Sequence, residues 1–527
     1  MTLYWKTLYF GFVWDDFDNI LRFDPNYNNI IDTFKNLQVY DLPANYYRPL
    51  ALISWMVDRL IWGEEPLGYH LAEIGLHAVN VVLVFFLSKK LLSKHDSAWM
   101  GAAVTAVIFA VHPVQTEAVC WIAARPELLF TMFTLGSFFA FTRFRDTQKE
   151  RWVALSLLLW FLAMLSKETA VAMVPCLMFY DILFITEKPA GAAKKLLPYI
   201  WYMIVFLIYF ILRERYLQNG HIALVEGAGA GELLKRTLSA YSFYIQQVIL
   251  PVSQKALVFG LPQDLSFILG GAIIIACAFY IGVLALKRGE RLPLYFICFF
   301  LITLFPSILV AVTSVSTVSV AKRYLYLPLY AVSFLIGLGV ITVPSGRYIN
   351  VVKWIVLFTA LFFLGYMTTK QMLPWQNDLI FWQTASKLNP DQGLPYQHIG
   401  AIYQQEGKYE QAVEFYSKAV LHQLDRGSKA VTFNNIGGIY LSFKQYEIAE
   451  DLFRKALQEN KDLPITYYNL GLLYSKRADD PKEKREEMLK KSVNFLKESI
   501  RLSPSYKKAQ NHLEKVTRLL ENNKPEK

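Results

Sequence analysis

Polar side chains that could do chemistry gather in five short segments of this chain, each beside an apolar stretch. The segments read FVWDDFDNI, YYRPL, HPVQTEAVCWIAARPELL, LSKET and AKRYLYLP. Paired carboxylates such as Asp15 and Asp16 can supply a general base for an acceptor hydroxyl. Arginine and lysine can hold a phosphate and stabilise it as it leaves. The other titratable residues of interest in these segments are Arg48, His112, Glu117, Arg125, Glu127, Lys167, Glu168, Lys322 and Arg323.

These residue types together indicate a site for an anionic, lipid-linked substrate. Neither GxGxxG nor GxxxxGK[ST] occurs, so a nucleotide cradle is not indicated. Structural alternatives stay open for several of the residues. The aspartate pair can form a solvated turn or a helix cap, and His112 and Glu117 can form a structural hydrogen-bonded pair. The side chains of Lys322 and Arg323 can simply reach to the membrane interface.

Two further histidines, His70 and His77, lie seven residues apart and therefore on one helix face. Interhelical polar groups explain them better than metal ligands do. The four cysteines show no CxxC pair, which indicates neither a disulfide framework nor a zinc site.

The elements that must position these residues are predicted to be membrane-spanning helices. The chain has 527 residues, of which 54% are hydrophobic and only 18% are charged, and the apolar excess lies before about residue 372. A disordered chain, a fibrous protein and a single soluble domain are thereby excluded. Apolar runs of about 17–20 residues can cross a bilayer as helices. The expected spans are 70–88, 98–112, 127–143, 152–166, 170–186, 197–212, 267–286, 293–311, 324–341 and 353–371, with 237–250 as an interfacial or re-entrant helix.

Basic residues are concentrated in every second loop between these spans, which predicts how the chain is oriented. The net charge is +11, and the basic loops lie at 89–94, 143–151, 188–195, 287–291 and 347–353. The positive-inside rule places these loops in the cytoplasm and explains the charge without nucleic acid. All five polar segments and the C-terminal part then face the other side.

One expectation concerns the N-terminus. A non-cytoplasmic first segment requires a span or a signal sequence before it, but residues 1–16 hold no apolar run of that length and no cleavage pattern. We therefore expect that a first transmembrane helix is missing from this chain.

A repeated pattern follows residue 390 and is typical of tetratricopeptide repeats. Small residues and aromatics recur at the positions where paired helices approach and where neighbouring repeats pack. Such stacks form a groove for peptides or partner proteins, and the alternative is a spacer or a stabilising cap. A segment from Trp382 to Pro390 resembles the second helix of an incomplete earlier repeat. The pattern positions are Gly400, Tyr403, Ala412, Tyr416 and Ala419, then Gly437, Tyr440, Ala449, Phe453 and Ala456, then Gly471, Tyr474, Ser492, Leu496, Ser499 and Pro504.

The motifs FVWDD, YRPL, HPxxTEAVxxIxxRPELL, LSKE and KRYLYLP, followed by these repeats, resemble the transmembrane-and-tetratricopeptide-repeat protein O-mannosyltransferase family and its bacterial relatives. That family belongs to the C-type glycosyltransferases, which use a polyprenyl-phosphate sugar on the non-cytoplasmic face. The resemblance implies that the catalytic base is Asp15 or Asp16, without separating them. It implies that Arg323 binds the donor phosphate, with Lys167 second and Arg48 also a candidate. It also implies inversion at the anomeric carbon.

The sequence therefore predicts an all-α protein with two domains. Residues 1–372 are expected to form a polytopic helical membrane domain of the C-type glycosyltransferase kind, and residues 373–522 a tetratricopeptide-repeat α-solenoid. Repeats are expected near 393–426, 430–463 and 464–507. Supporting polar roles are expected for His112, Glu117, Arg125, Glu127 and Glu168.

The expected function is transfer of a sugar, with mannose as a candidate, from a polyprenyl-phosphate donor to an acceptor hydroxyl of a protein or a glycan. No cofactor is required, and a divalent metal is compatible with the chemistry. Other expected partners are a peptide or protein in the repeat groove and membrane lipid. The expected location is a bacterial inner membrane with periplasmic repeats, or the endoplasmic reticulum membrane. The alternative is a non-catalytic membrane scaffold; a transporter is disfavoured because the charges cluster at one face.

Overall fold

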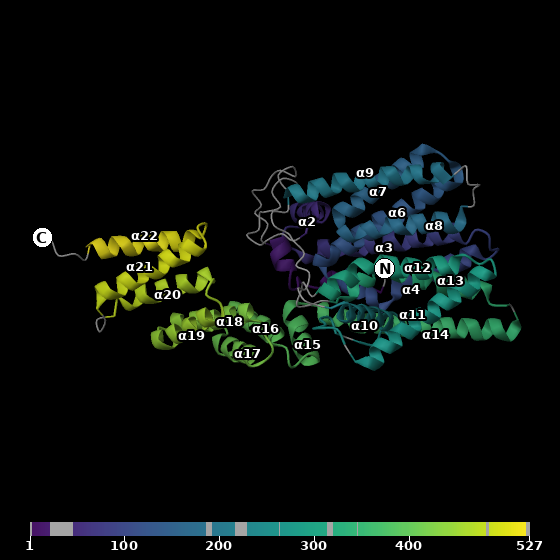
Figure 1. Cartoon of the computed structure of the whole chain (residues 1–527). Coiled ribbons are helices and arrows are strands. Elements are labelled where there is room, and N and C mark those ends of the chain that lie inside the picture. Colours follow the sequence, from purple (N-terminus) through teal and green to yellow (C-terminus); the bar gives the residue numbers. More distant parts are fainter. Residues whose placement is uncertain are drawn as a thin grey trace. The chain divides into compact units, whose positions relative to one another are not determined.

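The computed structural model describes residues 3–21, 46–185, 192–216, 229–253, 255–262, 264–313, 320–344, 346–480 and 484–522. Over these residues the chain is mostly helical, and its β-structure is limited to isolated bridges such as Val258 with Val320. The predicted all-α fold is therefore confirmed. The chain divides into two compact units, Met1–Phe381 and Trp382–Lys527 (Figure 1). This division falls inside a helix, α15 (Asp378–Leu388), a little beyond the domain boundary expected after residue 372.

The first unit is a bundle of apolar helices (Figure 1). Its elements are η1 (Trp5–Tyr9), η2 (Phe17–Leu21), α2 (Pro49–Trp62), α3 (Pro66–Leu91), α4 (Ala98–Val111), η4 (Pro113–Gln115), α5 (Thr116–Cys120), η5 (Ile122–Ala124), α6 (Arg125–Thr147), α7 (Glu150–Ser166), η6 (Glu168–Ala172), α8 (Met173–Phe184), α9 (Ala192–Tyr216), α10 (Ala230–Ile249), α11 (Leu265–Lys287), α12 (Leu292–Thr313), η8 (Lys322–Leu325), α13 (Leu329–Thr342), α14 (Arg347–Met372) and η9 (Leu373–Trp375).

Among the described helices, five are long and apolar enough to cross a membrane: α3, α9, α11, α12 and α14. A sixth results if α4 and the bent segment after it count as one span. The remaining predicted spans lie in α6, α7, α8 and α13, which are shorter or carry charged ends. The protein is thus a multi-pass membrane protein, and the number of its spans stays a prediction.

Most of the polar residues singled out in the sequence lie in or beside short helical turns at the ends of the long helices. The chain bends by 52° between α4 and the segment Pro113–Cys120. Pro113 lacks the N–H that would continue the helix, and the His112 ring accepts a hydrogen bond from the Val114 N–H. Similarly, η6 precedes α8 and η8 precedes α13. The turns therefore place the candidate site residues of the sequence analysis at the ends of the long helices.

The N-terminal segment packs into the first unit along its length. Phe12 and Ile20 are buried in one apolar cluster with Trp55 and Tyr69, which lie in α2 and α3. The Gly11 N–H also donates to a backbone carbonyl after η9 at 2.9 Å. The segment that carries the aspartate pair is therefore fixed from both sides.

The second unit is a solenoid of paired helices, as the repeat pattern predicts. Glycine is required in α16 because an added Cβ at Gly400 would lie 2.7 Å from the Tyr416 ring. The same distance separates an added Cβ at Gly437 from the Phe453 ring. Each glycine therefore lets one helix of a pair approach the aromatic residue of the other. The helices are α16 (Gly393–Gln405), α17 (Tyr409–Leu421), α18 (Arg426–Ser442), α19 (Tyr446–Glu459), α20 (Pro464–Arg477), α21 (Arg485–Leu502) and α22 (Lys507–Asn522).

Candidate functional site

A sharp turn presents the aspartate pair. Trp14 has a φ of 55°, in the left-handed region that bulky residues rarely adopt. Contacts with distant residues hold this conformation. The Trp14 N–H donates to Asp378 Oδ1 at 2.8 Å, and the Trp14 ring stacks on Trp121 with centroids 5.1 Å apart and planes 3° apart. The turn therefore sets the direction in which the next two side chains leave the backbone.

Asp16 is buried, and backbone N–H groups hold its carboxylate. Its exposed fraction is 1%, and its Oδ2 accepts from the Val13 N–H at 2.9 Å. Its Oδ1 accepts from the Ala123 N–H at 2.6 Å. Burial raises the pKa of Asp16 well above the usual range, and the two N–H donors act against that rise. One oxygen of Asp16 thus closes the N-terminal turn, and the other joins that turn to η5.

Asp15 has a different environment. It is only half-buried, and burial raises its pKa to about 6, while the nearby Arg323 charge lowers it and Asp18 raises it. A carboxyl group that titrates close to neutral pH is suited to accept a proton from an acceptor. The structure thereby distinguishes two neighbours that sequence alone leaves equivalent.

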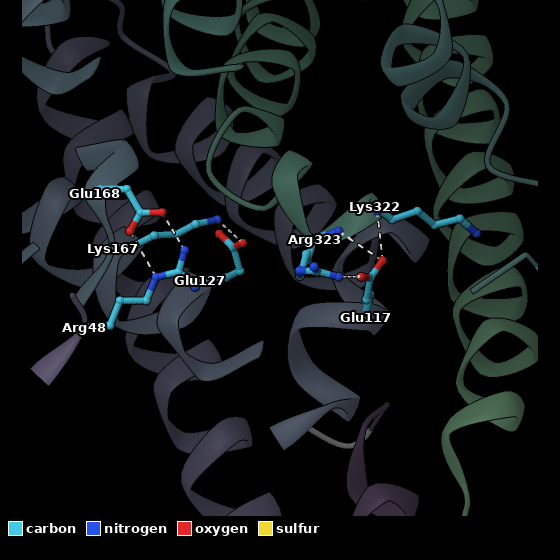
Figure 2. Close-up of polar contacts among 7 residues, drawn as sticks. All are labelled: Arg48, Glu117, Glu127, Lys167, Glu168, Lys322 and Arg323. Atoms are coloured by element: carbon cyan, nitrogen blue, oxygen red, sulfur yellow. Dashed lines mark hydrogen bonds and ion pairs between the residues drawn. The ribbon is translucent and has the colours of Figure 1, made fainter. Parts of the chain in front are cut away.

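Arg323 lies in η8, where two neighbouring cations take opposite directions (Figure 2). Its guanidinium pairs with the Glu117 carboxylate and lies 4.9 Å from the centroid of the Trp121 ring. The pKa of Arg323 is raised: burial opposes the rise, but Tyr324 and Glu117 outweigh it.

Lys322 has a separate set of partners. Its Nζ donates to the Ser253 carbonyl and, at 3.1 Å, to Gln371 Oε1. Burial lowers the pKa of Lys322 to about 8, against the effect of Glu117. Lys322 is buried and bonded, so it does not reach to the membrane interface as the alternative reading assumed.

Glu117 fixes the η8 turn. Besides its ion pair with Arg323, Glu117 Oε2 accepts from the Lys322 N–H at 2.9 Å and from the Arg323 N–H at 3.3 Å. The alternative in which His112 pairs with Glu117 is wrong. The His112 Nε2 instead lies 3.0 Å from the Val248 carbonyl oxygen, so His112 joins the bend to α10.

A second group of charges surrounds η6 (Figure 2). Arg48 holds Glu168 in a two-pronged pair, with Nε to Oε2 at 3.0 Å and Nη2 to Oε1 at 2.6 Å. Lys167 pairs with the Glu127 carboxylate at the start of α6. Burial tends to raise the pKa of Glu168, but Arg48 and then Lys167 outweigh it and hold it at about 2. Burial lowers the pKa of Lys167, and Glu127 opposes that effect.

The Tyr324 ring connects the two groups of charges. Lys167 Nζ lies 4.6 Å from its centroid, and Arg323 Cζ lies 5.0 Å from it. We call the set Arg48, Glu117, Glu127, Lys167, Glu168, Arg323 and Tyr324 the charged network. Each of its cations has a glutamate partner, and the side-chain exposures of the cations are 24% for Arg48, 20% for Arg323 and 5% for Lys167. An incoming anion therefore reaches the two arginines more easily than the lysine.

Arg125 lies outside this network, although its sequence position suggested a place in it. It is buried and pairs with Glu73 Oε1 and Asp58 Oδ2, each at 2.5 Å. These contacts join α6 to α3 and α2. Because Asp58 of α2 and Glu73 of α3 already bind its guanidinium, Arg125 is the centre of a structural ion-pair cluster.

Sequence reasoning missed the aromatic residues of the site. Trp14, Trp121 and Tyr324 contact either the aspartate turn or the cations. All three stand inside the quoted motifs, so their proximity to charges in the sequence was the available signal. Across the described ranges, no group of three or more His, Cys, Asp or Glu side chains is placed to hold a metal ion.

The fold and the site define a multi-pass membrane protein with a charged network at its helix ends and a helical repeat domain. A family profile described as dolichyl-phosphate-mannose-protein mannosyltransferase matches residues 50–212, and a tetratricopeptide-repeat profile matches residues 393–458. The first range includes Glu117, Glu127 and Lys167. These matches confirm the resemblance to the transmembrane-and-tetratricopeptide-repeat O-mannosyltransferase family.

Individual relatives carry corresponding names. Protein O-mannosyl-transferase TMTC3 of Mus musculus is 22% identical over 471 residues, which cover 80% of this chain and 50% of that protein. Protein O-mannosyl-transferase Tmtc1 of Drosophila melanogaster is 33% identical over 32% of this chain and 20% of its own length. Human TMTC4 is 34% identical over 26% of this chain and 21% of its own. The chain thus spans half or less of the length of these curated relatives.

Proposed function

We propose that this chain is an integral membrane glycosyltransferase that moves a sugar from a polyprenyl-phosphate donor to an acceptor hydroxyl. The observation that carries the proposal is the half-buried Asp15 carboxyl, whose pKa burial raises and the Arg323 charge lowers. This electrostatic contact supports Asp15 as the base for the acceptor and Arg323 as the cation for the leaving group. The printed names of the relatives support the same reaction class.

In the proposed reaction the acceptor oxygen attacks the anomeric carbon of the donor. The bond from that carbon to the phosphate oxygen breaks, and the acceptor proton passes to Asp15. Arg323 stabilises the negative charge that develops on the departing polyprenyl phosphate. Asp16 is a positioning residue, since both of its oxygens hold backbone N–H groups. A single displacement of this kind inverts the anomeric centre.

We propose that the donor phosphate binds mainly to Arg48 and Arg323, the two more exposed cations. Arg48 and Arg323 present planar guanidinium groups that match phosphate oxygens, and each can exchange part of its glutamate contact for the donor. Lys167 is more enclosed and contributes its charge from behind the Tyr324 ring. No cofactor is needed for this step, because polyprenyl phosphate is a good leaving group.

Mannose is the proposed sugar and a protein serine or threonine the proposed acceptor, because the relatives are named protein O-mannosyl-transferases. A glycan hydroxyl is the second candidate acceptor. The repeat unit is proposed to bind an acceptor peptide in its groove. By the positive-inside rule the reaction takes place on the non-cytoplasmic face, in a bacterial periplasm or an endoplasmic reticulum lumen.

The test supplies radiolabelled polyprenyl-phosphate mannose, and in parallel the glucose donor, to membranes containing the full chain. Label in the protein or the polysaccharide fraction identifies sugar and acceptor together. Asp15→Asn should abolish the label. Glu64→Gln should not, because Glu64 is exposed and pairs with Arg59 at the surface, away from the charged network. Label that persists in Asp15→Asn would refute Asp15 as the base, and no label from either donor would favour the scaffold.

A further inference from the structure

A large cavity opens at the end of the membrane unit that carries the basic loops. Its volume is about 1080 Å³, at the upper end of the range for pockets that hold small molecules. Lys90, Lys94, His95 and Arg291 line one part of it. Tyr180, Phe184, Leu335 and Leu338 are among the apolar residues that line the rest. One cavity thus combines a basic rim with an apolar wall.

The cavity is separate from the charged network. It reaches Thr342 at the C-terminal end of α13, whereas Arg323 lies in η8 just before the N-terminal end of that helix. A helix of this length spans about 20 Å at 1.5 Å per residue. A molecule in the cavity would therefore not touch the proposed catalytic groups.

The cations of the rim are not all neutralised. Lys90 pairs with Asp146, and the Arg291 Nη1 donates to the Leu183 carbonyl at 2.6 Å. Within the described residues, the other guanidinium nitrogens of Arg291 make no further hydrogen bond and can bind a ligand. Lys94 is exposed at the mouth. Glu290 is a second carboxylate in the lining, so the basic side chains still exceed the acidic ones. The rim therefore favours an anion.

The apolar wall continues beyond this cavity. A second cavity of about 170 Å³ is lined only by apolar side chains of α10, α11, α12 and α13. It shares Ala278, Ile297 and Leu335 with the first, so the two adjoin. An apolar continuation of this kind suits a hydrocarbon chain, while a free anion would make no use of it.

We propose that the two cavities bind one membrane phospholipid with an anionic head group. Its phosphate lies against Lys94 and Arg291, and an acyl chain follows the apolar wall past Ala278 towards α10. Basic pockets between transmembrane helices are known to hold anionic head groups. The bound lipid fills the space between α8, α11 and α13 and does not depend on glycosyl transfer.

The test uses the full chain in detergent and native mass spectrometry. Phosphatidylglycerol and phosphatidylcholine with identical acyl chains compete for retention, and inorganic phosphate is added in a separate arm. One phosphatidylglycerol should be retained in preference. Lys94→Ala should weaken it about fivefold, the effect expected for one basic residue. Ala278→Trp should remove retention by filling the shared wall. A lipid-dependent rise in melting temperature, lost in Lys94→Ala, gives a second readout.

A matched control is Lys149→Ala, since Lys149 is exposed in another basic loop but does not line the cavity. This variant should retain the lipid like the parent chain. Equal retention of both lipids, or equal loss in Lys149→Ala and Lys94→Ala, would overturn the proposal in favour of general attraction to the surface. If inorganic phosphate displaced the lipid and Ala278→Trp retained the lipid like the parent chain, the proposal would be overturned in favour of a simple anion site.

Discussion

The ion pairs of the two units differ in how deeply they are buried and in how far apart their partners lie in the chain. In the membrane unit, ion pairs such as Lys167 with Glu127 and Arg125 with Glu73 are buried and join segments far apart in the chain. In the repeat unit, many pairs, such as Lys418 with Glu414, are exposed and lie four residues apart on one helix, although Arg477 with Glu450 joins two helices. Burying charge is costly, so the buried pairs need a structural or functional reason that the exposed ones do not.

The largest expected effect is on turnover. Asp15→Asn removes the proposed base while keeping the size of the side chain, and should lower the rate of sugar transfer by about 10²–10⁴-fold. Its thermal unfolding should be close to that of the parent chain, because Asp15 is half-buried. Rates with a labelled donor and melting in detergent check both.

Asp16→Asn provides the contrast within the pair. An amide can accept only one of the two backbone N–H groups that Asp16 now holds, so this variant should melt at a lower temperature. Equal melting temperatures for the two variants would contradict the distinction between base and positioning residue.

The next largest effect is expected on stability, when the buried ion pairs of Arg125 are broken. Arg125→Met leaves Asp58 and Glu73 without their cation and should destabilise the membrane unit by about 3–5 kcal/mol. Adding Glu73→Met to that variant should recover part of the loss, because one unpaired carboxylate is removed. Denaturation in detergent measures both variants. A single substitution that leaves stability unchanged would show that the centre is dispensable.

Within the repeat unit, packing should count for more than charge. Gly437→Ala places a methyl group against the Phe453 ring and should cost about 1–3 kcal/mol. Gly438→Ala is its matched control, since nothing lies within 4 Å of an added Cβ there. That control should stabilise helix α18 by up to about 1 kcal/mol. Hydrogen exchange of peptides from α18 and α19 in the full chain reports the two outcomes.

The smallest effect is expected at the exposed pairs. Lys418→Ala removes the partner of Glu414, and Lys455→Ala removes that of Asp451. Each pair is worth about 0.3–0.5 kcal/mol. Hydrogen exchange in α17 and α19 should therefore change little. A loss of several kcal/mol at either position would erase the contrast between the two units.

The sequence predicts the elements well because their signals are local. Apolar runs and the spacing of Gly400 and Tyr416 are visible within one or two helices, and most helices form where expected, although α2 does not lie in any predicted span. The pairings of the charged network are not local. Arg323 meets Glu117 across 206 positions, and Arg48 meets Glu168 across 120. No spacing rule finds such partners.

The same limit explains why roles within the site could not be assigned from the sequence. Arg125 stands in the most specific motif, yet its partners come from α2 and α3, so it serves the bundle and not the network. Asp15 and Asp16 are identical in sequence terms. Their burial and the N–H groups of Val13 and Ala123 separate them, and Ala123 belongs to a distant segment.

The pH dependence of sugar transfer tests the central claim most directly. A base must be deprotonated to act, so transfer by the parent chain should fall as the pH drops through about 6, the pKa to which burial raises Asp15. Arg323 lowers the pKa of Asp15, so Arg323→Gln should reduce the rate and also move the midpoint to higher pH. A midpoint that stays in place in Arg323→Gln, or a flat profile between pH 5 and 8 in the parent chain, would contradict the assignment of Asp15 as the catalytic base.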